Sequence, residues 1–253
     1  MTTDLNLHKD LTALAEVTDA FERSWSITDQ GVEARVLFFC DTSVAAAKAL
    51  AQAAQGLQID PALLADWSSA IAGSDAIGLA LRCDRRSVRL YTQYWLAVVA
   101  RLEAGDRSPF PLYRGFKALP GGVSRRDDYL CLPAAPAQVF WPPMAAGFAA
   151  FGLDTDQGAE VFRSLSAESA IFTVTEDPNR QSWLTTTRRA EIPKAALAEW
   201  LAPLADRPGG AAIIAAAQSE PLVHVAGGRD QVKGDVLTFY FETDQNTALA
   251  SII

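Results

Sequence analysis

The sequence predicts an α+β fold in which ten antiparallel strands form a β-barrel with helices on the outside. Three observations support this fold class. Strand-like runs occur in pairs joined by short polar breaks, as in β-hairpins. The pairs recur about every fifty residues, mostly separated by two helical patterns, so that the chain repeats an α-α-β-β unit. Within the clearest pair, apolar and polar side chains alternate, as in a strand whose two faces meet different surroundings.

The hairpin from Ile77 to Trp95 shows this alternation best. Its two strand-like runs flank Asp84-Arg85-Arg86, a polar break typical of a turn. One face of the second run is aliphatic or small: Val88, Leu90 and Thr92. The other face carries a guanidinium, a phenol, an amide and an indole: Arg89, Tyr91, Gln93 and Trp95. Taken alone, this hairpin also fits a sheet with one solvated face.

The remaining elements of the first half follow in order. Apolar residues at helical intervals predict a helix over 5–23, and a hairpin follows over 24–41. The sequence Asp41-Thr42-Ser43 begins a helix that ends near residue 55, and Asp60-Pro61 begins another that ends near residue 72. A short helix over 96–104 follows the central hairpin.

The second half repeats the same order. Strand-like runs at 109–119 and 128–134 flank a polar loop, and the hairpin over 169–192 contains an Asp-Pro-Asn-Arg turn. The last hairpin spans 221–243 and is followed by a short tail over 246–253. Helical patterns fill the intervals: 136–151, where Pro142-Pro143 must start or interrupt the helix, then 155–165, 193–204 and 209–218.

Five hairpins of this kind can close into a barrel, which removes exposed strand edges. A barrel of ten strands is too wide to be filled by its own side chains and encloses a cavity. Two separate α+β sheets remain a competing architecture, whereas a doubly wound sheet is disfavoured because its strands alternate singly with helices. We expect residues 1–253 to form one such domain.

Composition restricts the function further. The net charge of −8 gives no electrostatic support for a nucleic-acid partner. The N-terminus shows no secretory signal, and no apolar run is long enough for membrane insertion, so we expect a cytoplasmic protein. The three cysteines lie far apart in apolar runs (Cys40, Cys83 and Cys131), which favours buried thiols over a disulfide or a zinc site.

Two short motifs and the order of the elements point to a known family. Arg89-Leu90-Tyr91 is similar to the basic-x-Tyr strand pattern of the ABBA-type aromatic prenyltransferases, and Tyr240 lies in a similar late strand. The succession of α-α-β-β units resembles that family over nearly the whole chain. The resemblance implies a PT barrel that binds its substrates inside. Members of the family are usually longer, which leaves open a trimmed or more open barrel.

The resemblance implies transfer of a dimethylallyl or geranyl group from an allylic diphosphate to an electron-rich aromatic acceptor. The acceptor could be a small molecule or an aromatic side chain of a peptide. Arginine and lysine would bind the diphosphate, and aromatic faces would stabilise the allylic carbocation. No cofactor is required by this chemistry, and dependence on Mg²⁺ stays open.

The polar faces of the hairpins would line the cavity if the aliphatic faces pack on helices. Leu184 is expected to face outward, which would turn its neighbour Trp183 inward. The residues expected to bind substrate are Arg89, Tyr91, Gln93, Trp95, Lys117, Trp183, Arg189 and Tyr240. Rearomatisation releases a proton, and by strand parity Glu242 and His224 are the candidates to accept it.

Each of these residues also has a purely structural interpretation. Arg89 could pair with an acidic neighbour, Lys117 could be solvated, and His224 could be structural. Asp127-Asp128 is interpreted as a solvated turn, not as part of a metal site. The competing hypothesis for the whole chain is a non-catalytic barrel or α+β protein that binds a hydrophobic ligand or a protein partner. Convergence of the basic and tyrosine candidates in one cavity would favour the enzyme.

Overall fold

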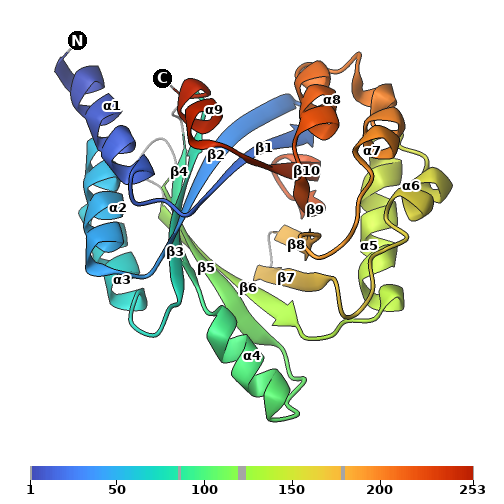
Figure 1. Cartoon of the computed structure of the whole chain (residues 1–253), viewed down its shortest axis with the longest axis horizontal. Helices are drawn as coiled ribbons and strands as arrows, with labels where there is room; N and C mark the ends of the chain where they lie inside the picture. The colour runs from blue at the N-terminus through green and yellow to red at the C-terminus, as the bar shows by residue number, and fades with distance from the viewer. Residues whose placement is uncertain (1, 85–86, 119–123, 178–179, 253) are drawn as a thin grey trace.

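Ten antiparallel strands form a closed barrel with helices outside, which confirms the predicted fold class (Figure 1). The structure, a computed structural model, describes residues 2–84, 87–118, 124–177 and 180–252. The strands follow one another around the barrel in chain order, and β1 pairs with β10 to close it. The expected turns at 84–86, 120–127 and 177–180 lie partly outside the described residues.

The five hairpins have similar dimensions. The strands are β1 (Ala20–Thr28), β2 (Gly31–Asp41), β3 (Ala76–Arg82), β4 (Val88–Gln93), β5 (Phe110–Ala118), β6 (Ser124–Leu132), β7 (Ile171–Asp177), β8 (Arg180–Thr186), β9 (Leu222–Asp230) and β10 (Gly234–Thr243). The helices are α1 (Thr2–Ala15), α2 (Val44–Gly56), α3 (Pro61–Ala70), α4 (Trp95–Glu103), α5 (Ala137–Ala150), α6 (Thr155–Val161), α7 (Lys194–Trp200), α8 (Gly210–Ser219) and α9 (Gln245–Ala250).

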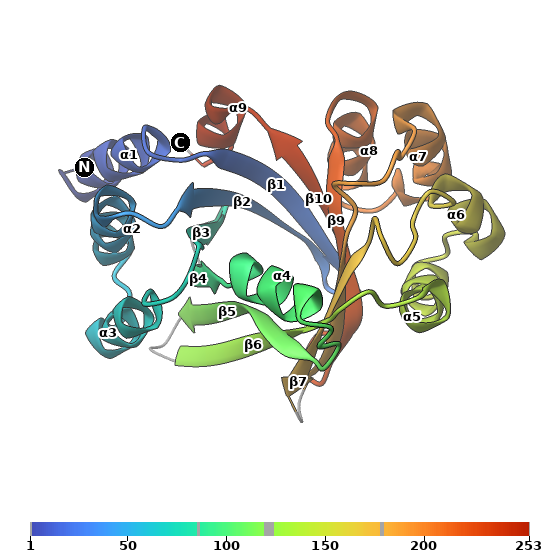
Figure 2. The same cartoon turned by 60° about the horizontal axis from the view of Figure 1, so that its bottom comes forward.

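This topology gives the barrel two chemically different ends. The hairpin turns lie at one end, which we call the turn end, and the helical connections join the strands at the other, which we call the helix end. Figure 2 shows α4 in front of the barrel strands. Val98 of α4 packs against Leu112 and Cys131, so this helix lies against the helix end of β5 and β6.

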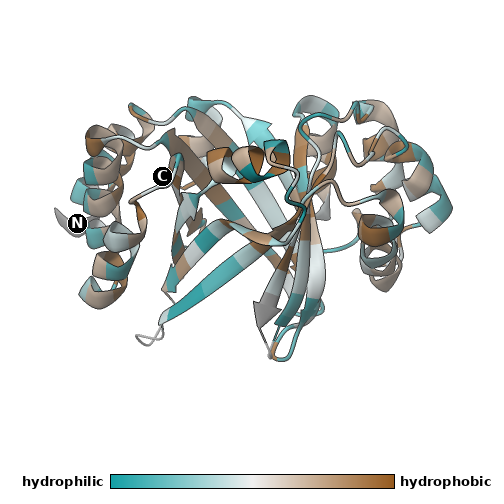
Figure 3. Cartoon of the chain, turned by 90° about the horizontal axis from the view of Figure 1, so that it is seen from below, coloured by the Kyte–Doolittle hydropathy of each residue, from teal (hydrophilic) through white to brown (hydrophobic). Residues whose placement is uncertain are grey.

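The outward faces of the strands bury two hydrophobic cores against the helices. One core packs strand residues such as Phe38 and Leu79 against α1, α2 and α3. The other packs Phe239 and Phe241 against the helices from α5 to α8. Figure 3 shows hydrophilic and hydrophobic residues alternating along the barrel strands. Because strand side chains alternate faces, polar residues are left for the interior.

Two element boundaries differ from the expected ones, and both differences place polar residues inside the barrel. The first helix ends at Ala15, and β1 already begins at Ala20, because Phe21 and Trp25 pack on the outside of the sheet. Strand β6 begins at Ser124, inside the segment expected to be a loop. The C-terminal tail also forms a helix, α9.

The close approach of β8 and β9 depends on Gly228. Its φ of +141° lies in a region that disfavours side chains, and a Cβ there would lie 2.0 Å from the backbone oxygen of Gln181. Gly31 also has a positive φ, but a Cβ there would meet no atom within 4 Å. We expect Gly228→Ala to lower the free energy of unfolding by about 3 kcal/mol or more, and Gly31→Ala by about 1 kcal/mol. Urea denaturation of both variants measures the difference, and equal losses would contradict it.

Candidate active site

A cavity of about 400 Å³ runs into the barrel from its helix end. Every strand contributes to its lining, including Glu22 of β1, Tyr129 of β6 and His224 of β9. A second, smaller pocket of about 90 Å³ continues toward the turn end. Arg89, Tyr91 and Tyr240 line both spaces, so these residues lie where the two join.

The smaller pocket is basic. Its lining includes five basic and two acidic side chains: Arg35, Arg89, Lys117, Arg180 and Lys233, with Glu33 and Asp230. We call this space the basic pocket. Its surplus of positive charge contrasts with the chain's net charge of −8. An anion bound there would compensate charges that the protein itself does not balance.

Three cations lie side by side on three neighbouring strands of the barrel. Arg89, Lys117 and Arg125 pair in register on β4, β5 and β6, an arrangement that costs stability unless it is neutralised. Asp127 is almost completely buried, and its carboxylate lies 3.3 Å from the Arg89 guanidinium and 2.7 Å from that of Arg125. Arg180 approaches the same carboxylate at 3.8 Å. One carboxylate therefore pairs with three arginines. The interpretation of Asp127 as a solvated turn residue is wrong, because Asp127 lies in strand β6 and is buried.

Lys117 has no ion-pair or hydrogen-bond partner among the residues that the structure describes. Burial lowers the pKa of Lys117 to about 6, and the surrounding cations, Arg89, Arg35, Arg125 and Lys233, act in the same direction. An anion in the basic pocket would supply the missing counter-charge.

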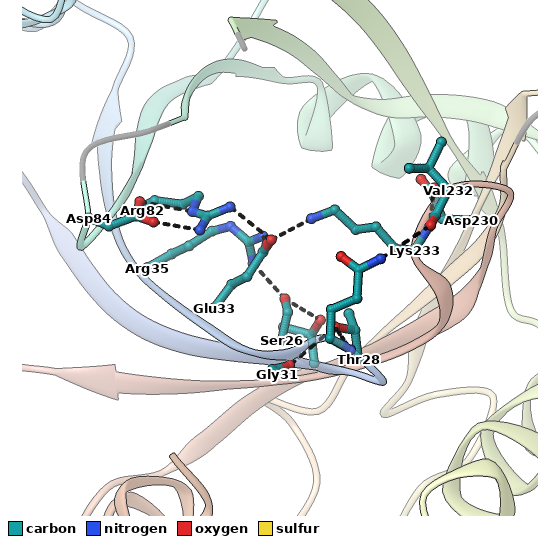
Figure 4. Close-up of polar contacts among 12 residues, drawn as sticks. Ser26, Thr28, Gly31, Glu33, Arg35, Arg82, Asp84, Asp230, Val232 and Lys233 are labelled. Atoms are coloured by element: carbon teal, nitrogen blue, oxygen red, sulfur yellow. Dashed lines mark hydrogen bonds and ion pairs between the residues drawn. The ribbon is translucent and has the colours of Figure 1, made fainter. Parts of the chain in front are cut away.

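Glu33 organises the remaining cations of the turn end (Figure 4). Its carboxylate accepts from Arg35, from Arg82 at 2.8 Å and from Lys233 at 2.5 Å. Arg35 also donates to Ser26 at 2.5 Å. Burial raises the pKa of Glu33, but Lys233, Arg35 and Arg82 lower it more strongly. The pKa therefore lies below its usual value, and the carboxyl stays ionised. The pocket thus has fixed donors before any ligand binds.

Aromatic rings cover the wall between the basic pocket and the helix end. The Tyr91 ring lies 5.9 Å from Phe39 and 6.4 Å from Tyr129, whose ring lies 6.4 Å from Tyr113. Arg89 donates to the hydroxyls of Tyr91 and Tyr129, which fixes its guanidinium beside these rings. Burial raises the pKa of Tyr91, so its hydroxyl stays protonated.

Toward the helix end, the cavity wall holds a buried carboxylate. Glu22 Oε1 lies 3.3 Å from His224 Nε2 and 2.6 Å from a guanidinium nitrogen of Arg188. Burial raises the pKa of Glu22, but His224 and Arg188 lower it more strongly, so the pKa lies below its usual value. The other oxygen, Oε2, is buried and has no hydrogen-bond partner among the described residues. Glu22 is therefore a buried, ionised carboxylate in the wall of the cavity.

The structure brings most of the sequence-predicted residues together. Seven of them line the main cavity from the expected faces or from the helix end: Arg89, Tyr91, Gln93, Trp95, Arg189, His224 and Tyr240. Lys117 lines the basic pocket instead. The Arg189 guanidinium lies 5.5 Å from the centroid of the Trp95 ring. The roles assigned to these residues remain predictions.

The expected parity of the fourth hairpin is wrong. Leu184 lines the cavity, whereas Thr185 contacts Met144 of α5. Trp183 packs in the outer core, where its ring lies against Gly147 of α5, and only part of it borders the cavity. An indole fills the space between the sheet and the helix better than leucine would, which reverses the expected faces.

Glu242, the expected proton acceptor, lies on the rim of the helix end. Its side chain is 47% exposed, it pairs with Arg188, and it does not line the cavity. The buried carboxylate of the site is that of Glu22, which lies in β1 and not in the helix predicted over 5–23. The alternation of Glu22, Ser24 and Ser26 with outward aromatic residues is the signal that could have found it.

Comparison with solved structures supports the predicted resemblance. The chain superposes on a 5-dimethylallyltryptophan synthase from Streptomyces coelicolor with a TM-score of 0.60 and 16% identity, covering 97% of this chain and 92% of that one. The fold is that of the ABBA-type aromatic prenyltransferases. A 6-dimethylallyltryptophan synthase from Micromonospora olivasterospora, in complex with DMASPP and Trp, gives a TM-score of 0.58 at 14% identity, over 93% of this chain and 84% of that one.

PriB in complex with diphosphate matches with a TM-score of 0.59 and 14% identity, over 97% of both chains. The ten strands of this chain form a closed barrel. The more open barrel, which the short length of the chain had left possible, is therefore not observed. No protein-family model and no curated protein matches the sequence.

Two further observations concern membrane-spanning helices and metal binding. Within the described ranges, no helix is long and apolar enough to cross a membrane. The described part of the chain also contains no group of three or more histidine, cysteine or acidic side chains arranged to hold a metal ion.

Proposed function

We propose that the protein is an aromatic prenyltransferase that transfers a dimethylallyl or geranyl group from an allylic diphosphate to an electron-rich aromatic ring. The observation that carries this proposal is the basic pocket, which joins an aromatic-walled cavity inside an ABBA barrel. Basic groups, phenols and a buried carboxylate follow one another along the barrel axis, in the order that donor, carbocation and acceptor require.

The diphosphate would bind in the basic pocket. Arg89, Arg180 and Lys117 would contact its oxygens, because guanidinium groups bind phosphate through two parallel hydrogen bonds and lysine acts as a point charge. Five basic side chains can neutralise the leaving group without a metal ion, so we propose no cofactor. Transfer is to be measured with and without Mg²⁺, because the ion could still assist.

The prenyl group would extend toward the helix end, beside Tyr91, Tyr129 and Tyr240. The bond between the prenyl carbon and the diphosphate oxygen breaks, and its electron pair leaves with the diphosphate. Aromatic faces stabilise the resulting allylic cation by cation–π attraction and exclude water from it. Both effects require the cation to form inside the closed barrel.

The aromatic acceptor would lie at the helix end, beside Glu22. Its ring electrons form the new C–C bond to the cation, and the ring then carries the positive charge. The Glu22 carboxylate accepts the proton from the ring carbon, which restores aromaticity. We propose Glu22 in place of Glu242 in this role because Glu22 is buried and lines the cavity, whereas Glu242 does not. His224 supports it through Oε1.

The alternative of a non-catalytic ligand-binding barrel is less well supported. It predicts basic groups scattered toward solvent, whereas Arg89 and Lys117 converge on one pocket with Tyr91 and Tyr240. A barrel that binds an uncharged ligand has no use for three adjacent cations, Arg89, Lys117 and Arg125, of which only the two arginines pair with the nearby Asp127.

The proposal is tested by incubating the protein with dimethylallyl or geranyl diphosphate and a panel of indoles, phenols and aromatic peptides. Tryptophan comes first, because two of the similar structures are named as tryptophan-prenylating enzymes. Mass spectrometry should detect an acceptor heavier by one prenyl group, together with release of diphosphate. Donor binding without any transfer across the panel would favour the ligand-binding alternative.

Lys117 gives donor binding a specific pH dependence. Because the pKa of Lys117 is about 6 in the empty barrel, the lysine is mostly neutral at pH 7.5 and takes up a proton when a diphosphate binds. Affinity should therefore fall as the pH rises from 7 to 8.5, by up to about tenfold per pH unit. Calorimetric titration with dimethylallyl thiodiphosphate in two buffers of different ionisation enthalpy measures this uptake.

Lys117→Arg is the matched control, because arginine stays charged over this range. It should bind the analogue without the proton uptake seen in the wild type. Equal proton uptake in both proteins would contradict the assignment to Lys117.

A further inference from the structure

The two oxygens of Glu22 have different surroundings. Oε1 is approached by His224 Nε2 at 3.3 Å and Arg188 at 2.6 Å, whereas Oε2, although buried, has no partner in the part of the chain that the structure describes. An unpartnered carboxylate oxygen in a buried position costs free energy, which the ion pairs of Oε1 must offset. The two donors on Oε1 hold the Glu22 carboxylate in the wall of the cavity.

The backbone on both sides of Arg188 is fixed by hydrogen bonds. Strand β8 ends at Thr186, and the next residue, Thr187, donates its backbone N–H and its hydroxyl to β9, each at 2.8 Å. The chain then turns, with Ala190 donating to the Thr187 carbonyl at 2.8 Å. The Arg188 side chain thus begins at a fixed corner and reaches Glu22 on β1, with Glu242 of β10 on its other nitrogen.

These contacts differ from an ordinary surface ion pair, which contributes little. The Glu22 side chain is only 3% exposed, while Arg188 is 36% and Glu242 47% exposed. Arg188 therefore connects a solvated carboxylate on the rim with a buried one inside. His224 is fixed separately, since its Nδ1 lies 2.9 Å from the Thr186 hydroxyl.

We propose that Arg188 is a positioning residue of this site: it holds the Glu22 carboxylate through Oε1 in the wall of the cavity, and Glu242 anchors Arg188 from the rim. This inference rests on the proposed function, in which Glu22 accepts the proton. It assigns to Glu242 a supporting part in place of direct contact with the substrate.

The direct test is a ¹³C NMR titration of the Glu22 carboxyl, assigned with Glu22→Gln, in the wild type and in Arg188→Gln. The charged groups that face Glu22 are His224 of β9, Arg188 and, through Arg188, Glu242; the Tyr113 phenol of β5 also senses its charge. Removing the guanidinium should raise the titration midpoint of Glu22 by about one pH unit. Arg189→Gln is the matched control, because Arg189 is adjacent in sequence but stacks on Trp95.

In the active enzyme, the acidic limb of the pH profile of kcat/KM should move upward in Arg188→Gln by the same amount, with Arg188→Lys intermediate. A loss of activity without a shift of the limb would indicate a merely structural role and overturn the inference, as would an unchanged NMR midpoint. If the wild type transferred no prenyl group, the proposed function would fail, while the NMR titration would still decide whether Arg188 controls Glu22.

Discussion

Replacing Arg89 with alanine should lower the affinity for an allylic diphosphate by about ten- to a hundredfold. A hydrogen bond to a charged group contributes about 1.5–3 kcal/mol, and each 1.4 kcal/mol is a factor of ten in the dissociation constant. The Arg89 side chain is 13% exposed and lies where the basic pocket meets the main cavity. Arg125 still pairs with Asp127 in the variant, so the buried acid keeps a partner.

Arg114→Ala is the matched control for this experiment. Arg114 lies on the neighbouring strand, pairs at 3.0 Å with a half-exposed partner, Asp128, and lines neither space. Calorimetry with dimethylallyl thiodiphosphate should show weak binding for Arg89→Ala and unchanged binding for Arg114→Ala. Equal affinities in a folded Arg89→Ala would place the diphosphate elsewhere.

Replacing Glu22 with glutamine should lower kcat for prenyl transfer by about 10²- to 10⁴-fold, the usual contribution of a positioned general base. Glutamine keeps the shape of the side chain but cannot accept the proton. Donor binding should be unaffected, because Glu22 lies toward the helix end and does not line the basic pocket. Rapid-quench kinetics with saturating donor and acceptor separate the chemical step from binding.

A second glutamate provides the control for that substitution. Glu220 also pairs with an arginine, Arg23, at 2.5 Å and is partly buried, but it is not part of the cavity lining. Glu220→Gln should keep the wild-type kcat. If Glu22→Gln also kept it, another group would have to accept the proton, and the position of the acceptor in the barrel would have to be revised.

The sequence predicted the barrel and part of the site because strands alternate their faces. The inward position of Arg89 and Tyr91 follows from Val88 and Leu90 packing outside, and the same argument holds for Tyr240. The recurrence of hairpins predicted ten strands, but it left two separate sheets open, and the structure shows one closed barrel.

The missed residues have physical reasons in common. Glu22 follows apolar residues at helical spacing, so the helix was extended past its true end at Ala15. A barrel with a polar interior makes an inward strand face resemble a loop, which is why Asp127 was placed in one. The contact between Glu33 and Lys233 joins residues 200 positions apart, and local pattern carries no information about it.

The central claim is that a diphosphate binds in the basic pocket of a native barrel. The most direct measurement is a thermal-shift titration with dimethylallyl and geranyl thiodiphosphate, in the presence and absence of Mg²⁺. A ligand that binds only the native state stabilises it by about 2.7 kcal/mol at a hundredfold excess over its dissociation constant. We expect saturable stabilisation that is lost in Arg89→Ala and kept in Arg114→Ala. No shift with either analogue under any of these conditions would contradict the account.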